Sequence, residues 1–221
     1  LPVRVVARAF EPDPEASLPF GLSSHGLSED FSTRPPTSLY GATKLASEQL
    51  ALEYGEAFEF PVWINRCGVM AGAGQFGRAD QGIVSFWIHS WKEKRPLRYI
   101  GFDGEGHQVR DCLHPADLIP LLERQLGAVP SQCPRTVNVS GGRASAFSLR
   151  QLSDWCEARF GRHAVGHEAE PRPFDLPWMV LDSALAAQAW DFAPTRSKES
   201  IFEEIALHAE RNPEWLSLSE P

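Results

Sequence analysis

The sequence of 221 residues lacks an apolar run of about 18 residues, the length that a membrane-spanning helix requires. Its start has no basic segment followed by an apolar stretch, which would be the pattern of a secretory signal. The formal net charge of -8 argues against a nucleic-acid surface, because such surfaces need clustered basic residues. A few local arginines can still hold a small anion in an acidic protein. We therefore expect no membrane and no nucleic-acid partner.

Cysteine is also scarce: there are four, and none stands in a Cys-x-x-Cys pair. This spacing favours reduced thiols in a cytoplasmic protein over a disulfide scaffold or a zinc site. His163 and His167 are four residues apart, but the glycines around them favour a loop that enters a strand. We predict no metal site.

The order of patterns along the chain predicts an α/β protein with parallel strands, because short apolar strands alternate with amphipathic helices. Helices are expected over 38–58, 83–95, 116–126, 149–160, 182–188 and 198–211, and strands over 60–67, 97–100, 109–114, 136–140 and 172–180. Residues 1–36 are dense in proline and glycine and predict a long irregular loop. The segment Phe102–Gly106 predicts a tight hairpin, with glycine supplying positive φ.

Tyr40 and Lys44 are four residues apart in the segment SLYGATK, so a helix places both on one face. A phenol is a poor base at neutral pH, and bringing one from a pKa of ~10 to about 7 costs roughly 4 kcal/mol. One ammonium at ~4 Å supplies about this much at an effective dielectric of ~20. A tyrosine assisted by a lysine is therefore a sufficient general base for an alcohol. The spacing alone is equally met by an ordinary exposed Tyr–Lys pair.

Five segments together resemble one enzyme family. SLYGATK resembles the active-site helix of the extended short-chain dehydrogenases/reductases, the NAD-dependent epimerase and dehydratase family, where the pattern is S-x-Y-G-x-S/T-K. The other four follow in the family's order, and the five cover about residues 37–205: PVWINRCGVMAGAGQF, VRDCLHPADLIPLL, TVNVSGG and RPFDLPWMVLDSALAAQAWDFAP. Within the family, AGAGQF followed by ADQGIVSFW resembles the CDP-paratose (tyvelose) 2-epimerase branch.

The resemblance implies NAD as cofactor and a nucleotide-diphosphate sugar as substrate. Tyr40 would remove the proton of the C2 hydroxyl while the C2 hydride passes to NAD, and the keto sugar would be reduced again from the opposite face. Lys44 would bind the hydroxyls of the nicotinamide ribose. Cys67 and Gly68, just past a strand, would line the nicotinamide side.

Four further residues are implied in substrate binding. Gln75 and Gln81 would face the sugar or the nucleotide, with a solvated loop as the alternative. Arg110 and Arg172 would bind the diphosphate, because a planar guanidinium suits phosphate oxygens. For the arginines the alternative is an ion pair with Asp111 or Asp175.

The family's G-x-x-G-x-x-G loop, which should precede the tyrosine, is not found in residues 1–39. We therefore expect an incomplete Rossmann-type parallel sheet without its N-terminal strands, and a small C-terminal substrate-binding α/β domain. The NAD-binding part would comprise 1–70 and 107–142, and the substrate-binding part 71–106 and 143–221. The chain alone is predicted not to bind NAD tightly, and its remaining strands to expose an apolar edge and face.

The resemblance leaves the activity open within and beyond the family. A sister 4-epimerase, 4,6-dehydratase or reductase is one alternative, and a non-catalytic remnant that keeps a sugar-nucleotide pocket is another. The family resemblance also implies a homodimer for the full-length form.

Overall fold

The computed structural model describes residues 1–78, 81–170 and 172–219. It is an α/β structure, and most of its strand pairs are parallel, as the alternation of patterns predicted. The helices are α1 Leu39–Ala57, α2 Ile83–Lys92, α3 Ile119–Leu126, α4 Leu149–Phe160, α5 Ala184–Trp190 and α6 Lys198–Arg211. The strands are β1 Val3–Val6, β2 Ala9–Pro12, β3 Ile64–Cys67, β4 Val69–Met70, β5 Leu97–Ile100, β6 Val109–Leu113, β7 Thr136–Val139, β8 Ala146–Ser148, β9 Val165–Glu168 and β10 Trp178–Met179.

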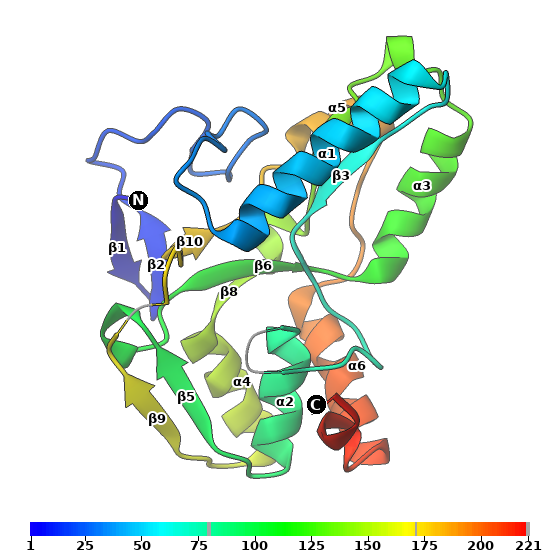
Figure 1. The fold of residues 1–221 in the computed structure, drawn as a ribbon. Helices are drawn as coiled ribbons and strands as arrows, with labels where there is room; N and C mark the ends of the chain where they lie inside the picture. Colours follow the sequence, from blue (N-terminus) through cyan, green and yellow to red (C-terminus); the bar gives the residue numbers. More distant parts are fainter. Residues whose placement is uncertain (79–80, 171, 220–221) are drawn as a thin grey trace.

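Strand β6 connects the two halves of the molecule. It pairs in parallel with β4 and β10 and antiparallel with β8. Strand β3 pairs in parallel with β7, and β5 pairs in parallel with β9. In Figure 1 the half with β3 carries α1, α3 and α5, and the half with β5 and β9 carries α2, α4 and α6.

Each half has its own apolar core. Leu121, Val137, Val139 and Trp190 lie in the core formed by α3, β7 and α5. A larger core joins α2, β5, α4 and α6, and its buried members include Trp87, Trp91, Tyr99, Leu152, Ile201 and Ile205. None of the helices in the described ranges combines the length and the apolar character that crossing a bilayer requires.

Helix α1 lies on the outside of the molecule. Ser38 caps its first turn, accepting a hydrogen bond from the backbone N–H of Gly41 at 3.0 Å. An ion pair of 2.6 Å between Glu48 and Arg66 ties the helix to β3. Gly55 is its one buried residue, and several large apolar side chains on or beside it are exposed: Leu39, Tyr40, Leu50, Tyr54, Phe58 and Phe60. Among the described strands β3 pairs only with β7, so an apolar surface and a strand edge are exposed together, as predicted.

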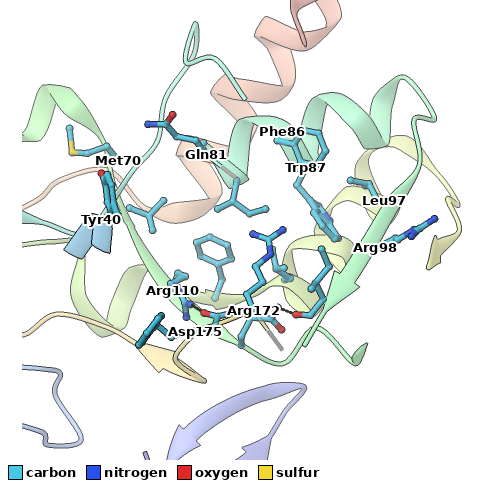
Figure 2. Close-up of a pocket in the computed structure, with 18 of the residues that line it drawn as sticks. Tyr40, Met70, Gln81, Phe86, Trp87, Leu97, Arg98, Arg110, Arg172 and Asp175 are labelled. Carbon is cyan, nitrogen blue, oxygen red and sulfur yellow. Dashed lines mark hydrogen bonds and ion pairs between the residues drawn. The ribbon is translucent and has the colours of Figure 1, made fainter. Parts of the chain in front are cut away.

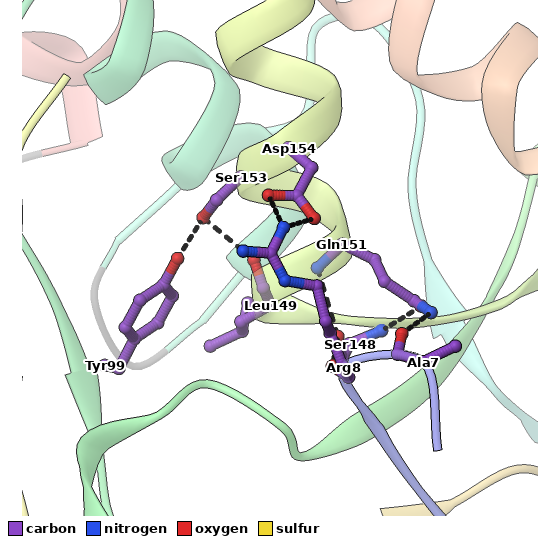
Figure 3. A network of polar contacts seen from close by, with 8 residues as sticks. All are labelled: Ala7, Arg8, Tyr99, Ser148, Leu149, Gln151, Ser153 and Asp154. Carbon is purple, nitrogen blue, oxygen red and sulfur yellow. Dashed lines mark hydrogen bonds and ion pairs between the residues drawn. The ribbon is translucent and has the colours of Figure 1, made fainter. Parts of the chain in front are cut away.

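The prediction of an irregular segment over residues 1–36 was wrong at its start, where β1 and β2 form an antiparallel hairpin. Its two turn residues, Ala7 and Arg8, both have positive φ, at 47° and 68°, although neither is glycine. Contacts with the start of α4 hold this turn (Figure 3): the Ser148 hydroxyl donates to the Arg8 carbonyl at 2.7 Å, and Gln151 donates to the Ala7 carbonyl at 3.1 Å. Arg8 also pairs with Asp154 at 2.6 Å. The turn is therefore stabilised by contacts with α4 rather than by its own sequence.

The hairpin predicted at Phe102–Gly106 is absent, and this prediction was wrong. The segment begins with a single 3-10 turn over Phe102–Gly104, and β5 before it pairs with the distant β9. The Gly104 carbonyl accepts a hydrogen bond from the His167 ring nitrogen Nδ1 on β9 at 2.8 Å. The glycines therefore serve a turn between sheets and not a two-stranded ribbon. Of the predicted strand over 172–180, only Trp178–Met179 is a strand.

Candidate active site

A pocket of about 1130 Å³ lies between the two halves of the molecule. Its walls come from the start of α1, β4 and the loop after it, α2, β5, β6 and the segment 172–175. Five of the eight residues predicted for the site line it: Tyr40, Gln75, Gln81, Arg110 and Arg172. Figure 2 shows that Tyr40 stands at one end and Arg98 at the other, with Arg110 and Arg172 between them.

Tyr40 and Lys44 are placed together as their spacing predicted. The Lys44 ammonium nitrogen lies 5.3 Å from the centroid of the Tyr40 ring. Tyr40 is 70% exposed and reaches the rim of the pocket from the first turn of α1. The pair therefore offers a phenol and an ammonium to a ligand that enters the pocket from this rim.

Cys67 and Gly68 lie at the carboxyl end of β3 and do not line the pocket. Cys67 is exposed and carries a free thiol. A Cβ atom at position 68 would stand 2.7 Å from a carboxylate oxygen of Asp111 and 2.8 Å from the Ser140 hydroxyl. Packing against these two side chains is thus a structural reason for glycine at this position.

Asp111 follows the pocket residue Arg110 in the chain, and its carboxyl group is buried. It accepts hydrogen bonds from the Ser140 hydroxyl and from the Leu181 backbone N–H. Burial raises the pKa of Asp111 to about 6, and these hydrogen bonds oppose the rise. Asp111 stands in the middle of β6 and links this strand to Ser140 after β7 and to Leu181 after β10.

Gln75 and Gln81 differ in burial although both line the pocket. The Gln75 amide donates to the Met70 carbonyl at 2.8 Å, while its side-chain oxygen is buried and has no partner in the described part of the chain. Gln81 is exposed, and its backbone exchanges hydrogen bonds with Arg78. The carboxamide of Gln75 is therefore the more firmly placed of the two.

Arg110 is half-buried and makes the ion pair that the alternative reading invoked, with Asp175 at 2.5 Å. Its guanidinium also donates to the carbonyls of Val109 at 2.7 Å and Leu176 at 2.9 Å. Burial lowers the pKa of Arg110, and the carboxylate of Asp175 opposes this. Arg172 is exposed and extends from its segment into the pocket (Figure 2). The two cations therefore face one space, one fixed and one on the surface.

Several pocket residues were not singled out from the sequence. They are Phe86 and Trp87 on α2, Leu97 and Arg98 on β5, and Gln108 before β6. In the sequence the polar Arg98 lies between the apolar residues Leu97 and Tyr99, and this period of two was the signal that could have turned attention to Arg98. Gln108 is only 8% exposed, and its side-chain oxygen has no partner among the described residues.

The histidines near β9 have backbone contacts of their own. His163 contacts the Arg95 carbonyl and His167 the Gly104 carbonyl, each at 2.8 Å. Within the ranges that the structure describes, no three His, Cys, Asp or Glu side chains are placed to hold a metal ion together.

The fold and the pocket define an α/β protein with parallel strands and a Tyr–Lys pair at the rim of a pocket that is lined by Arg98, Arg110 and Arg172. The model of the NAD dependent epimerase/dehydratase family matches residues 16–140, more than half of the chain. The chain belongs to this family.

Curated relatives and solved structures agree with this membership. The chain is 31% identical to CDP-paratose 2-epimerase of Salmonella typhi over 71% of its own length and 47% of that protein. It is 30% identical to the uncharacterized UDP-glucose epimerase YtcB of Bacillus subtilis over 85% of its length and 56% of that protein. UDP-glucuronic acid 4-epimerase from Bacillus cereus, solved with UDP-glucuronic acid and NAD, superposes with a TM-score of 0.72 at 25% identity, covering 87% of this chain and 58% of the other. The chain thus spans about half the length of the curated relatives it matches.

Proposed function

We propose that this protein epimerises a nucleotide-diphosphate sugar by transient oxidation to a keto sugar, with Tyr40 as the base. One observation carries the proposal: the fold brings Tyr40, Gln75, Arg110 and Arg172 from four distant segments to a single pocket. The phenol at the rim, the carboxamide of Gln75 and the guanidinium groups of Arg110 and Arg172 match a sugar joined to a diphosphate. Relatives whose names include CDP-paratose, UDP-glucose and UDP-glucuronate epimerases support the same reading.

The residues of the pocket divide the work between binding and proton transfer. Arg110, held in place by Asp175, presents a fixed guanidinium to the diphosphate, and the exposed Arg172 presents a second one in the same pocket. The sugar then extends toward Tyr40, whose oxygen accepts the proton of a sugar hydroxyl. The Lys44 ammonium, 5.3 Å from the ring centroid, stabilises the charge that develops on this oxygen.

The residues present fit the nicotinamide end of NAD. Lys44 and Tyr40 stand exposed on one helix face, and the exposed Cys67 ends the neighbouring strand β3. Lys44 would hold the ribose hydroxyls there, and Cys67 and Gly68 would border the nicotinamide. When bound, NAD accepts and returns the sugar hydride. No glycine-rich strand–turn–helix for the pyrophosphate occurs in the described ranges, so tight binding by these residues alone is not expected.

We propose C2 as the epimerised carbon, on the strength of the AGAGQF and ADQGIVSFW segments and the similarity to CDP-paratose 2-epimerase. Carbon 4 is the second candidate, because UDP-glucose and UDP-glucuronate 4-epimerases are also among the relatives. The proposal includes a cytoplasmic location, a homodimer in the full-length form, and the division into an NAD-binding part (1–70, 107–142) and a substrate-binding part (71–106, 143–221).

Calorimetric titration of the chain with UDP-glucose and CDP-glucose tests the pocket. Arg110→Ala should weaken binding of either compound by about ten-fold or more, because it removes a charge-assisted contact worth roughly 1.5–3 kcal/mol. Arg124→Ala is the matched control, since Arg124 pairs with Asp191 at 3.0 Å outside the pocket. The proposal is wrong if the chain binds neither compound, or if the two variants behave alike.

An isotope experiment identifies the epimerised carbon. Protein purified from its native cells is supplied with NAD and with nucleotide hexoses that carry deuterium at C2 or at C4. Inversion at C2 with the label retained supports C2 epimerisation, because the hydride leaves and returns to the same carbon. Inversion at C4 instead would overturn this choice and leave the family chemistry intact.

A further inference from the structure

All polar atoms of Gln75 except one make a hydrogen bond within the protein. Its side-chain nitrogen donates to the Met70 carbonyl at 2.8 Å, and its backbone carbonyl accepts from the Ser85 hydroxyl at 2.7 Å and the Trp215 indole N–H at 3.1 Å. Its side-chain oxygen is buried and has no partner in the described part of the chain. Because the amide nitrogen already faces a carbonyl, rotating the amide would bring two oxygens together. The atom left for a ligand is therefore an acceptor.

Trp215 reaches this loop from the other end of the chain. It opens the 3-10 segment Trp215–Ser219 that follows α6, and its indole stacks on the Phe76 ring with centroids 5.0 Å apart and planes at 4°. The indole also makes an edge contact with the His208 ring on α6, with ring centroids 4.7 Å apart, and this second contact helps to fix its position. Trp215 thus contacts two consecutive loop residues, one through a hydrogen bond and one through a ring.

The loop needs such support, because it carries little structure of its own. Gly72, Gly74 and Gly77 surround Gln75, and Gly74 has a φ of 76°. Glycine loses more conformational freedom on ordering than any other residue, so an isolated loop of this composition populates many conformations. The contacts from Trp215 and Ser85 select the one in which the Gln75 carboxamide lines the pocket.

We propose that Trp215 is a positioning residue that holds Gln75 as a preset hydrogen-bond acceptor for a hydroxyl group of the sugar. Phosphate oxygens at neutral pH accept hydrogen bonds and do not complement a bare acceptor, whereas sugar hydroxyls donate. Gln75 lines the same pocket as Tyr40, Arg110 and Arg172, and its bare acceptor complements a hydroxyl donor of the sugar rather than the diphosphate. The identity of the ligand rests on the proposed function, while the contact between Trp215 and the loop does not.

The test compares UDP-glucose with UDP, which lacks the sugar, by calorimetric titration of the 221-residue chain. Trp215→Phe keeps a ring for stacking and removes the indole N–H, and Trp215→Ala removes both. Trp155→Phe is the matched control, because Trp155 packs on Phe160 and Phe202 and does not line the pocket. Hydrogen exchange of the amides in residues 73–77 is followed without ligand in the same proteins.

Trp215→Phe should weaken the binding of UDP-glucose by about three- to ten-fold, the range for one neutral hydrogen bond. The affinity for UDP should stay within about two-fold of its value in the unmodified protein. Gln75→Ala should do the same, and adding Trp215→Phe to it should change nothing further. If Trp215→Phe weakens the binding of UDP and of UDP-glucose equally, Trp215 only supports the structure in general, and the proposal is wrong. The proposal is also wrong if neither affinity changes.

The two proposals fail in distinguishable ways. If the unmodified chain binds neither compound, the proposed function fails. The role of Trp215 is then decided by exchange: faster exchange of residues 73–77 in Trp215→Ala than in Trp155→Phe supports it. Indistinguishable exchange in the two variants overturns it.

Discussion

Replacing His89 with phenylalanine should make the protein more resistant to acid. His89 is fully buried on α2, and neither ring nitrogen has a partner in the described part of the chain. The ring lies against His208 of α6, with centroids 5.6 Å apart. Burial lowers the pKa of His89 to about 4, and the charges of His208, Lys92 and Arg95 act in the same direction. His89 is therefore neutral in the folded protein over the whole range above about pH 5.

The size of the effect on stability follows from the pKa of His89 in the unfolded and in the folded protein. The pKa falls from 6.5 to about 4 on folding, which corresponds to roughly 3 kcal/mol at about 1.36 kcal/mol per pKa unit. Because the folded pKa is depressed, the full stability is present above pH 6.5 and is lost as the pH falls toward 4. At pH 5 the loss amounts to about 2 kcal/mol. Phenylalanine keeps an aromatic ring, although a larger one, and takes up no proton, so its variant escapes this loss.

Asp111 changes the free energy of unfolding with pH in the opposite direction to His89, and the assay has to separate the two effects. Its pKa is raised to about 6, so its contribution to stability is greatest at low pH and is lost as the pH rises through 6. The pH profile of the unmodified protein therefore contains two opposing changes. The difference between the His89→Phe variant and the unmodified protein cancels the part due to Asp111.

Urea unfolding followed by circular dichroism at pH 7.5 and pH 5.0 measures this difference. At pH 7.5 the two proteins should differ only by the packing of the larger ring, about 1–3 kcal/mol, because the ring nitrogens that are removed made no hydrogen bond in the described part of the chain. Between pH 7.5 and pH 5.0 this difference should shift by about 2 kcal/mol in favour of the variant. His25→Gln, at an exposed position, is the control and should show no such gain. The same difference in free energy at both pH values would refute the reasoning.

Three further substitutions test the site and its supports. Tyr40→Phe in the native protein should lower turnover by about 10²–10⁴-fold with binding of UDP-glucose nearly unchanged, and substantial residual turnover would exclude Tyr40 as the base. Ser148→Ala should cost about 1–2 kcal/mol in urea unfolding, because Ser148 caps α4 and also donates to the Arg8 carbonyl; Ser148→Thr should restore most of this. Gly68→Ala should destabilise the fold, because its Cβ would meet Asp111 and Ser140, and a neutral result would show that β3 can shift.

Much of the fold is determined locally and was therefore predictable. Helices α1, α4 and α6 begin beside serines at 38, 148 and 197, whose hydroxyls accept hydrogen bonds from the first turn. The alternation of strands and helices requires crossovers between parallel strands, which the pairs β3–β7 and β5–β9 show. Tyr40 and Lys44 share a face because a helix repeats every 3.6 residues. Residue identity and spacing suffice for each of these features.

Other features depend on contacts between distant residues, which spacing does not encode. The turn at Ala7 and Arg8 has positive φ without glycine, and hydrogen bonds from Ser148 and Gln151 on α4 hold it. The pocket likewise gathers side chains from segments between Ser38 and Asp175. The sequence by itself therefore determined the helices, the parallel α/β character and the family. Only the tertiary structure decided which residues share the pocket and which contacts hold them, because both depend on distant segments: Trp215 meets the Gln75 loop across 140 residues of chain.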